Sequence, residues 1–311
     1  MDLSLLYHPI RTIRAKLFSM FFRSSYFKKR VTNNPKVVIS LQWFADSGYF
    51  FNWKNPRNLN EKILWLSVNS DTTKWSQCTD KYAVRDYVKA CNLSDILTKC
   101  YAIEDKFENI NFDSLPNAFA IKCTHDQGST RIVRDKSKIN FDEFSLYYNK
   151  CLGRRIGDVS GEPHYLKIQP RIMIEELIPF SQDVTSVSQI DYKFWCFNGK
   201  VHHCFICYDR NAHDVSFNTY SVSPWKERTE LLSKAYRKKN IKQIPEPANL
   251  SEMIEIAEKL AKPFPVVRVD LYNNHGKIYF GELTFTSCAG RMSYFSPEAL
   301  IEMGKLIPLN R

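Results

Sequence analysis

Charged side chains interrupt two β-rich segments near the end of the sequence, at positions where buried strands would be apolar. The segments, residues 265–272 and 277–286, flank an Asn-Asn-His-Gly sequence that predicts a hairpin. If Gly276 takes the left-handed position of a three-residue loop, Arg268 lies directly opposite Glu282. The alternate positions are apolar and are expected to pack on a core: Val267, Val269, Leu271, Tyr279, Leu283 and Phe285.

The charged face of this hairpin carries a second carboxylate and a hydroxyl. Asp270 is expected diagonal to Glu282, and Thr284 continues the same face. Two neighbouring carboxylates are ligands that suit Mg²⁺ bound to phosphate oxygens, and Arg268 beside them can hold another phosphate oxygen. A cross-strand pair between Arg268 and Glu282 on a solvent-facing sheet explains the same pattern without any ligand. Both interpretations stay open for the hairpin alone.

A lysine ends the apolar strand predicted at residues 118–123, and a polar loop follows it. Lys122 points toward this loop, which contains Gly128 and Ser129 before a second strand begins. Backbone N–H groups of such a loop can cradle phosphates while the lysine neutralises them. A snorkelling lysine beside an ordinary hairpin is the alternative. Asp126 in the same loop would repel a triphosphate unless its side chain is turned away.

Carboxylates also interrupt the apolar strand predicted at residues 171–178. Glu175 and Glu176 stand where the end of this strand would otherwise be buried. An unpaired buried carboxylate is costly, so the pair indicates either a bound partner or an exposed edge strand.

A further hairpin is predicted at residues 190–210, with its turn at Asn198-Gly199. Alternation places Asp191 and Lys193 on one of its faces. The next segment, residues 208–249, is predicted to be an inserted loop. Two of its side chains, Arg210 and Trp225, are candidates to line an acceptor site, although a solvated loop explains the segment equally well.

A lysine is also expected near the start of a helix around residue 80. Thr79 can cap that helix, which places Lys81 in the first turn, where the helix dipole does not favour a cation. A lysine in this position is either accidental or serves a phosphate.

The composition is that of a globular protein that can bury a large core. The chain has 311 residues, 44% of them hydrophobic, and a net charge of +11. Nine scattered cysteines form no disulfide framework, which predicts a reducing, cytoplasmic setting. No run of apolar residues is long enough to span a bilayer, and no signal peptide is evident.

Much of the positive charge lies in residues 1–30, which hold seven Lys or Arg against one Asp. Residues 10–22 have the spacing of a short amphipathic helix, and Lys28, Lys29 and Arg30 follow it. This segment suits peripheral contact with an anionic membrane surface on the inner face of the plasma membrane, or a helix packed on the core of the protein. The sequence has no recognisable nucleic-acid-binding module, so nucleic acid is not an expected partner.

Two segments resemble a known family. The sequences VVRVDLY and YFGELTFT of the charged hairpin resemble the metal-binding end of ATP-grasp carboxylate–amine ligases, and most closely their TupA-like branch from bacterial surface-polysaccharide gene clusters. The sequence NPRNLNEKILWL at residues 55–66 also resembles this branch. The resemblance covers about residues 55–290.

The resemblance implies an α+β protein with the ATP-grasp fold, in which two lobes with antiparallel sheets grip ATP after a helical N-terminal region. The expected divisions are a basic amphipathic segment at 1–31, a helical region at 32–115, a lid subdomain with the phosphate loop at 116–180, and a C-terminal subdomain with the metal site at 181–311.

The resemblance also implies roles for individual residues. Lys122 and Arg268 would be catalytic, and Mg²⁺ would be held by Asp270, Glu282 and Thr284. The residues implied to bind ATP are Lys81, Lys122, Gly128, Ser129, Glu175, Glu176, Leu177, Asp191 and Lys193.

The implied activity is an ATP-dependent, ADP-forming carboxylate–amine ligase that works through an acyl phosphate. Its partners would be ATP, a carboxylate-bearing sugar or polysaccharide precursor, and an amine, in the synthesis of capsule, O-antigen or another cell-surface polysaccharide. The alternative is a glycosyltransferase of the same biosynthesis. That activity would be expected to use an Asp-x-Asp motif, which this sequence does not contain.

Overall fold

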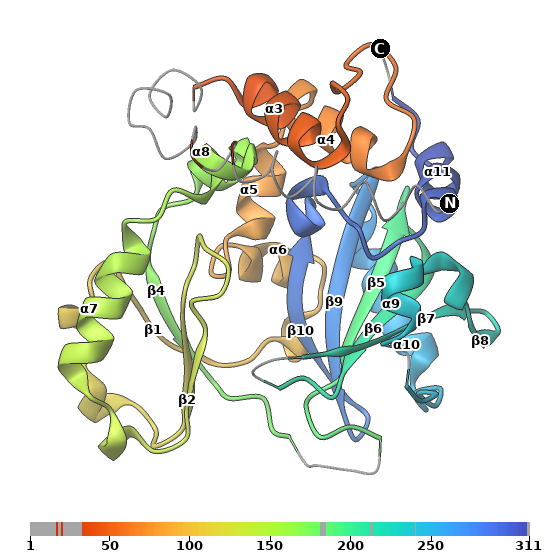
Figure 1. The fold of residues 1–311 in the computed structure, drawn as a ribbon. Coiled ribbons are helices and arrows are strands. Elements are labelled where there is room, and N and C mark those ends of the chain that lie inside the picture. Colours follow the sequence, from red (N-terminus) through yellow and green to blue (C-terminus); the bar gives the residue numbers. More distant parts are fainter. Residues whose placement is uncertain are drawn as a thin grey trace.

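The computed structural model describes residues 33–180, 185–211, 214–239 and 241–309, together with Leu17 and Met20 (Figure 1). The helix predicted at residues 10–22 lies outside the described residues apart from Leu17 and Met20, so its contact with a membrane stays a prediction. In the part of the chain described, no helix combines the length and the apolar character needed to cross a bilayer.

Two antiparallel sheets form the framework of the protein (Figure 1). The small sheet has the order β1-β4-β2-β3, with β1 at Cys100–Glu104, β2 at Phe119–Cys123, β3 at Arg131–Val133 and β4 at Ile172–Glu175. The large sheet has the order β10-β9-β5-β6-β7-β8, with β5 at Asp191–Phe197, β6 at Lys200–Tyr208, β7 at Ser216–Val222, β8 at Trp225–Glu227, β9 at Val266–Asn274 and β10 at Lys277–Thr284.

Helices cover the sheets and fill the space between them. Their bounds are α3 Pro35–Ser47, α4 Leu59–Asn69, α5 Thr73–Thr79, α6 Val84–Ala90, α7 Phe141–Leu152, α8 Ile156–Ser160, α9 Lys234–Arg237, α10 Leu250–Ala261 and α11 Pro297–Lys305. Short 3₁₀ turns connect several of these elements. Helices and antiparallel sheets together confirm the predicted α+β class.

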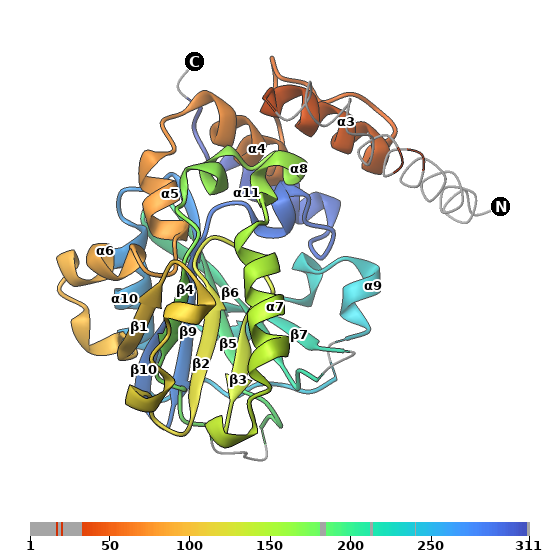
Figure 2. The same ribbon diagram turned by 90° about the vertical axis from the view of Figure 1, so that its left-hand side faces the viewer.

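The small sheet is covered on one face by α7 (Figure 2). Ile121 and Ile174 point into this core, and the buried Tyr148 of α7 donates its hydroxyl to the Ile121 carbonyl at 3.0 Å. Side chains alternate along a strand, so Lys122 and Glu175 belong to the opposite face. Figure 1 shows α7 on the outer side of this lobe, which leaves the Lys122 face turned toward the large sheet.

The large sheet packs one face against α10. The helix begins at Leu250, and its inward positions are all buried: Met253, Ile256, Ala257 and Leu260. The Asn249 side chain precedes the helix but does not cap its backbone. Val269 and Leu271 of β9 are fully buried on the α10 side, which leaves the charged face of the hairpin for other contacts.

The helical region before the sheets is fixed by a capping box at α4. The Asn58 side chain accepts a hydrogen bond from the Glu61 N–H at 3.0 Å, and the Glu61 carboxylate accepts one from the Asn58 N–H at 3.4 Å. These two hydrogen bonds fix the start of α4. Helix α11 packs across α4, which ties the end of the chain to this region.

Two segments differ from their predicted structure. Residues 208–249 are not only a loop, because β7 and β8 add two strands to the large sheet and α9 follows them. The strand β1 comes from the region predicted to be helical, yet it pairs with β4 of the small sheet. The boundaries of the expected subdomains themselves stay predictions.

Replacing Gly304 by alanine tests the packing of α11 on α4. An added Cβ would lie 2.8 Å from the Asn58 backbone, which cannot move without disturbing the α4 cap. We expect Gly304→Ala to lower the unfolding free energy by about 1–3 kcal/mol, although alanine usually stabilises a helix. Gly153→Ala is the control, because its Cβ would have ordinary contacts at 3.7 Å. Urea titrations that leave both variants as stable as the wild type would contradict this packing.

Candidate active site

The register of the charged hairpin differs from the predicted one. The loop has two residues, His275 and Gly276, both with positive φ, and Asn274 pairs with Lys277. A bulge at Gly281 shifts the register once more, where a Cβ would lie only 2.9 Å from the Asp270 carbonyl oxygen.

These two irregularities place Asp270, and not Arg268, directly opposite Glu282. Arg268 pairs instead with Thr284. The predicted pairing of Arg268 with Glu282 is therefore wrong. The predicted face of Tyr279 is also wrong, because Tyr279 pairs with Tyr272 on the Arg268 side of the hairpin, whereas the other predicted positions keep their faces. All the apolar positions expected on the other face are buried.

Arg268 is the centre of this face. Its Nε donates to Asp270 Oδ1 at 2.7 Å, and its Nη2 donates to Asp270 Oδ2 at 2.7 Å and to Glu282 Oε1 at 2.9 Å. The same Nη2 donates to the Thr284 hydroxyl at 3.0 Å, and Nη1 donates to the Ser287 hydroxyl at 2.7 Å. The guanidinium is buried, so these contacts fix its plane rigidly.

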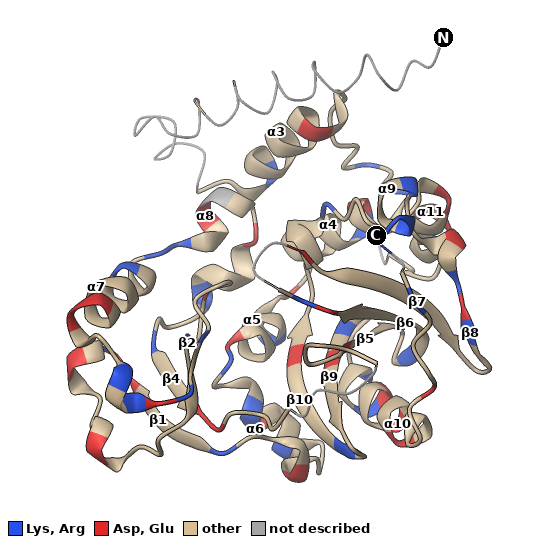
Figure 3. Ribbon diagram, turned by 60° about the horizontal axis from the view of Figure 1, so that its bottom comes forward, with Lys and Arg blue, Asp and Glu red and all other residues tan. Residues whose placement is uncertain are grey.

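The charges continue across the sheet into β5. Lys193 stands opposite Asp270 and donates to Asp270 Oδ2 at 2.6 Å, while Asp191 lies 3.5 Å from the same Nζ. Burial would lower the pKa of Lys193, but Asp270 and Asp191 outweigh it and raise the pKa. Figure 3 shows acidic and basic positions side by side on β5, β9 and β10. Lys193 therefore remains charged inside the protein.

A divalent cation fits the outer edge of this face. The Glu282 side chain is 49% exposed, and its Oε1 accepts from Arg268 and from the Thr284 hydroxyl at 2.8 Å. Burial would raise the pKa of Glu282, but the charges of Arg268, Lys193 and Lys81 lower it to about 2, so the carboxylate is ionised. Asp270 makes one hydrogen bond through Oδ1 and two through Oδ2, which leaves an acceptor position on Oδ1.

The small sheet contributes a lysine and a glutamate. Lys122 of β2 and Glu175 of β4 form an ion pair on the face away from α7. The Thr98 hydroxyl donates to the other oxygen of Glu175 at 2.8 Å. The predicted exposed edge strand is not observed, because β4 lies between β1 and β2.

The residues after β4 pass out of the small sheet. The Glu176 N–H donates to the Lys99 carbonyl at 2.8 Å, and its carboxylate accepts from the Lys99 N–H at 3.0 Å. Leu177 follows outside the strand, so its backbone is not part of the sheet pairing. A ligand that needs backbone hydrogen bonds could meet the chain at this point.

The position of Lys81 differs from the predicted one. Thr79 ends α5 and does not cap the next helix, and Lys81 lies in a turn before α6 begins at Val84. Asp80 stabilises this turn, because its Oδ1 accepts from the N–H groups of Tyr82 and Ala83 at 2.8 and 3.1 Å. The Lys81 N–H donates to the Thr124 carbonyl at 3.1 Å, and its amine donates to the Asp126 carbonyl.

The loop after β2 turns its acidic residue inward. Asp126 is fully buried, pairs with Arg154 at 3.0 Å and accepts a hydrogen bond from the Ser129 hydroxyl. Ser129 Oγ also accepts from the Cys123 N–H at 2.9 Å. The carboxylate therefore does not face a phosphate, but the predicted Ser129 side chain is also buried. Gly128 has φ +82° and open space around its Cβ position, so its backbone is accessible to a ligand.

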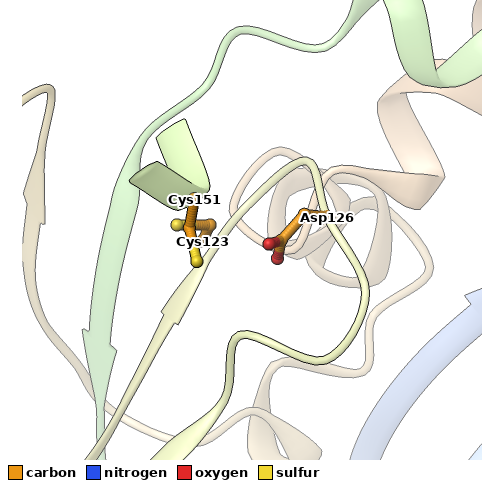
Figure 4. A group of neighbouring side chains, drawn as sticks. All are labelled: Cys123, Asp126 and Cys151. Carbon is orange, nitrogen blue, oxygen red and sulfur yellow. The ribbon is translucent and has the colours of Figure 1, made fainter. Parts of the chain in front are cut away.

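Asp126 also belongs to a buried group with Cys123 and Cys151 (Figure 4). Among the described residues, these three offer ligand atoms that all lie within 4.8 Å of one another. Burial raises the pKa of the Cys123 thiol to about 12, and Asp126 is already paired with Arg154. We therefore assign no metal to this group. Its Asp126 contacts hold the loop after β2 in place.

Lys81 links the two lobes electrostatically. Burial lowers the pKa of its amine, and its charge interacts both with Glu282 of the large sheet and with Lys122 of the small sheet. Two cations thus converge opposite an ionised carboxylate. This arrangement suits a polyphosphate held by lysines on one side and by a carboxylate-bound cation on the other.

Some contributors to this site were not among the predicted residues. Ser287 holds Arg268, and its hydroxyl lies 3.0 Å from that of the buried Tyr294. Thr98 holds Glu175, and Arg154 holds Asp126. These partners come from turns and helices whose sequences carry no pattern that marks them.

The sequence comparisons agree with this geometry. The family model described as TupA-like ATPgrasp matches residues 61–307. The chain belongs to the TupA-like ATP-grasp family. No curated protein matches the sequence. The α+β arrangement of this chain, with two antiparallel sheets and a helical region before them, is the ATP-grasp fold.

Solved structures show more distant likeness. A D-alanine–D-alanine ligase from Bacillus anthracis complexed with ATP is 16% identical with a TM-score of 0.42, over 69% of this chain and 57% of that one. The ATP-grasp ligase PsnB complexed with a minimal precursor is 10% identical with a TM-score of 0.41, over 75% and 60%. The ADP complex of PurK, an N5-carboxyaminoimidazole ribonucleotide synthetase, is 11% identical with a TM-score of 0.43, over 81% and 57%. The chain thus spans 57% to 60% of the length of these proteins.

Neutralising the two carboxylates should affect stability unequally. Asp270→Asn leaves Arg268 and Lys193 without their shared buried anion, so we expect it to lower the unfolding free energy by about 3–5 kcal/mol. Glu282→Gln changes a half-exposed group and should cost about 1 kcal/mol or less.

Thermal unfolding checks this difference, with the exposed Asp86→Asn as a control for the aspartate change. A midpoint for Asp270→Asn no lower than that for Glu282→Gln would contradict the structural role assigned to Asp270.

Proposed function

We propose that the protein is an ATP-dependent, ADP-forming ligase that joins a carboxylate to an amine through an acyl phosphate. The observation that carries this proposal is the charged face of the large sheet, where Arg268 binds Asp270 and Glu282 and Lys193 binds Asp270, in a chain with the ATP-grasp fold.

The residues have separate roles in this proposal. Mg²⁺ held by Glu282 and Asp270 would neutralise phosphate charge, and Thr284 would orient Glu282 through its hydroxyl. Lys122 and Lys81 would bind phosphate oxygens, which requires Lys122 to leave Glu175. Arg268 would stabilise charge on the transferred phosphoryl group while Asp270 and Ser287 hold its plane.

The remaining nucleotide contacts would come from the end of β4, from β5 and from the loop after β2. Glu175, Glu176 and the Leu177 backbone would receive the adenine, and Asp191 would lie toward the ribose, with Lys193 behind the phosphates. Gly128 would approach phosphate through its backbone. The Ser129 hydroxyl would first have to leave Asp126.

The chemistry needs no nucleophile from the protein. A carboxylate oxygen of the substrate attacks the γ-phosphorus and ADP leaves, and the amine then attacks the acyl carbon and displaces phosphate. We place the carboxylate on a uronic-acid sugar or related precursor of a bacterial surface polysaccharide. The reason is that the sequence resembles the TupA-like branch, which comes from gene clusters for such polysaccharides. No feature of the described residues favours the glycosyltransferase alternative.

Release of ADP tests this activity. The protein is incubated with MgATP and a panel of uronates and nucleotide-linked uronates, with and without a panel of amines. The proposal predicts ADP and phosphate release that depends on both a carboxylate and an amine. Transfer of a sugar from a nucleotide-sugar without ATP would contradict it.

Lys122→Met tests the lysine of the small sheet. Losing a charge contact in a site closed to water should cost about 2–4 kcal/mol in the transition state, so kcat/KM for ATP should fall roughly 30-fold to 1000-fold. Lys138→Met, on an exposed position of the same lobe, is the control and should change neither rate nor stability. Unchanged ATP turnover in a folded Lys122→Met protein would contradict the assignment of this strand.

We also propose that the basic segment at residues 1–30 holds the protein at an anionic membrane surface on the cytoplasmic side. Replacing Lys28, Lys29 and Arg30 by glutamate in the full chain should reduce binding to vesicles that contain phosphatidylserine. ADP release in solution should stay unchanged. Equal vesicle binding by both proteins would contradict this role.

A further inference from the structure

The charged face of the large sheet forms one continuous row of alternating charges. Following the ion pairs from β10, the row runs through Glu282, Arg268, Asp270, Lys193, Asp191 and Arg210. Three acids thus alternate with three bases, and each neighbouring pair lies between 2.6 and 3.5 Å apart. The row is electrically neutral as a whole, so its buried part needs no further partner.

The two ends of the row differ from its middle. The four inner side chains are between 3% and 13% exposed, whereas Glu282 is 49% and Arg210 is 54% exposed. One end therefore presents an anion to solvent and the other end presents a cation. The anionic end is the proposed metal site, and nothing described so far uses the cationic end.

Arg210 has no carboxylate of its own. Its Nη2 donates to Asp191 Oδ2 at 2.9 Å, and the same oxygen lies 3.5 Å from the Lys193 amine. Two cations thus share one acceptor atom. A guanidinium carries five N–H donors in a planar fork, and among the described residues only Nη2 of Arg210 has an acceptor, so the other donors can bind a second anion.

The backbone at Arg210 is held in place before any ligand arrives. Asp209 has φ +48°, which is an uncommon conformation for a residue with a side chain. Its carboxylate accepts from the Val187 N–H at 2.9 Å and pairs with Lys242 at 2.7 Å, and the Arg210 N–H donates to Ser188 Oγ at 2.8 Å. Such conformations persist where the surroundings fix them, and they are concentrated at functional sites.

We propose that Arg210 binds the carboxylate of the sugar-acid substrate, on the same charged face as the nucleotide site. A planar carboxylate can accept two parallel N–H bonds from the fork, which fixes its orientation as well as its position. This inference rests on the proposed function because it locates the carboxylate substrate of that reaction. It also separates the two acceptor candidates, because Trp225 stacks on Tyr220 and both line a surface groove elsewhere, at the last two strands of the sheet.

Chemical footprinting tests the site without any reaction. Phenylglyoxal modifies exposed arginines, and peptide mass spectrometry follows Arg210 and Arg155 in one sample. Arg155 is the matched control, because it is also exposed and also pairs with one aspartate at 2.6 Å. D-Glucuronate is the probe, D-glucose is its uncharged counterpart, and sodium chloride keeps the ionic strength equal.

The expected result is specific protection of Arg210. Glucuronate at about twice its Kd should slow the Arg210 modification about threefold, while glucose has no effect and Arg155 is unchanged. The proposal would be overturned if Arg210 were modified at the same rate with glucuronate as with glucose. It would also be overturned if glucuronate protected Arg155 as much as Arg210. The footprinting contains no ATP, so it is independent of the ADP-release assay. Protection of Arg210 in a protein that shows no carboxylate-dependent ADP release would support this binding site and contradict the proposed ligase activity.

A pair of variants separates binding from structure. Arg210→Gln should weaken glucuronate binding about tenfold to a hundredfold, the usual contribution of a charge-assisted hydrogen bond, and Arg210→Lys should restore only part of it. The thermal midpoint should stay close to that of Arg155→Gln. Unchanged glucuronate affinity in a folded Arg210→Gln protein would overturn the proposal.

Discussion

Asp270 lies buried between two cations, and the rest of the site depends on this arrangement. Arg268 binds it with two nitrogens and Lys193 binds it from the neighbouring strand. A lone buried charge would be very costly, so each of these groups requires the others in order to remain inside the protein. The same contacts hold Glu282 ionised at the surface, where a cation and a polyphosphate could meet it.

The fold serves this face by keeping its other side apolar. The α10 helix buries the alternate residues of β9, and α7 does the same for β2, so each sheet has one face left for chemistry. The second lobe brings Lys122 and, through the turn before α6, Lys81 to the large sheet. The two lobes therefore contribute opposite charges to a shared site, as expected for a protein that holds a nucleotide between two sheets.

Periodicity in the sequence was sufficient to predict the charged residues of this face, because alternation along a regular strand does not depend on register. It failed for Tyr279, which lies on the other side of the bulge at Gly281. It was not sufficient for the register itself. The pairing of Asp270 with Glu282 depends on the two-residue loop at His275-Gly276 and on the bulge at Gly281, and both are set by close backbone contacts. The inward turn of Asp126 depends on Arg154, which follows the end of α7 and which no local pattern indicates. The capping box of α4 and the apolar stripe of α10 each lie within one short segment, so both helices can be predicted from local sequence.

The most direct test of the account follows oxygen atoms from the carboxylate substrate. A substrate with both carboxylate oxygens labelled with oxygen-18 is converted with MgATP and its amine, and the released phosphate is analysed by mass spectrometry. An acyl phosphate intermediate predicts that each phosphate carries a single labelled oxygen from the substrate. Phosphate that contains oxygen only from ATP and water would contradict the ligase mechanism.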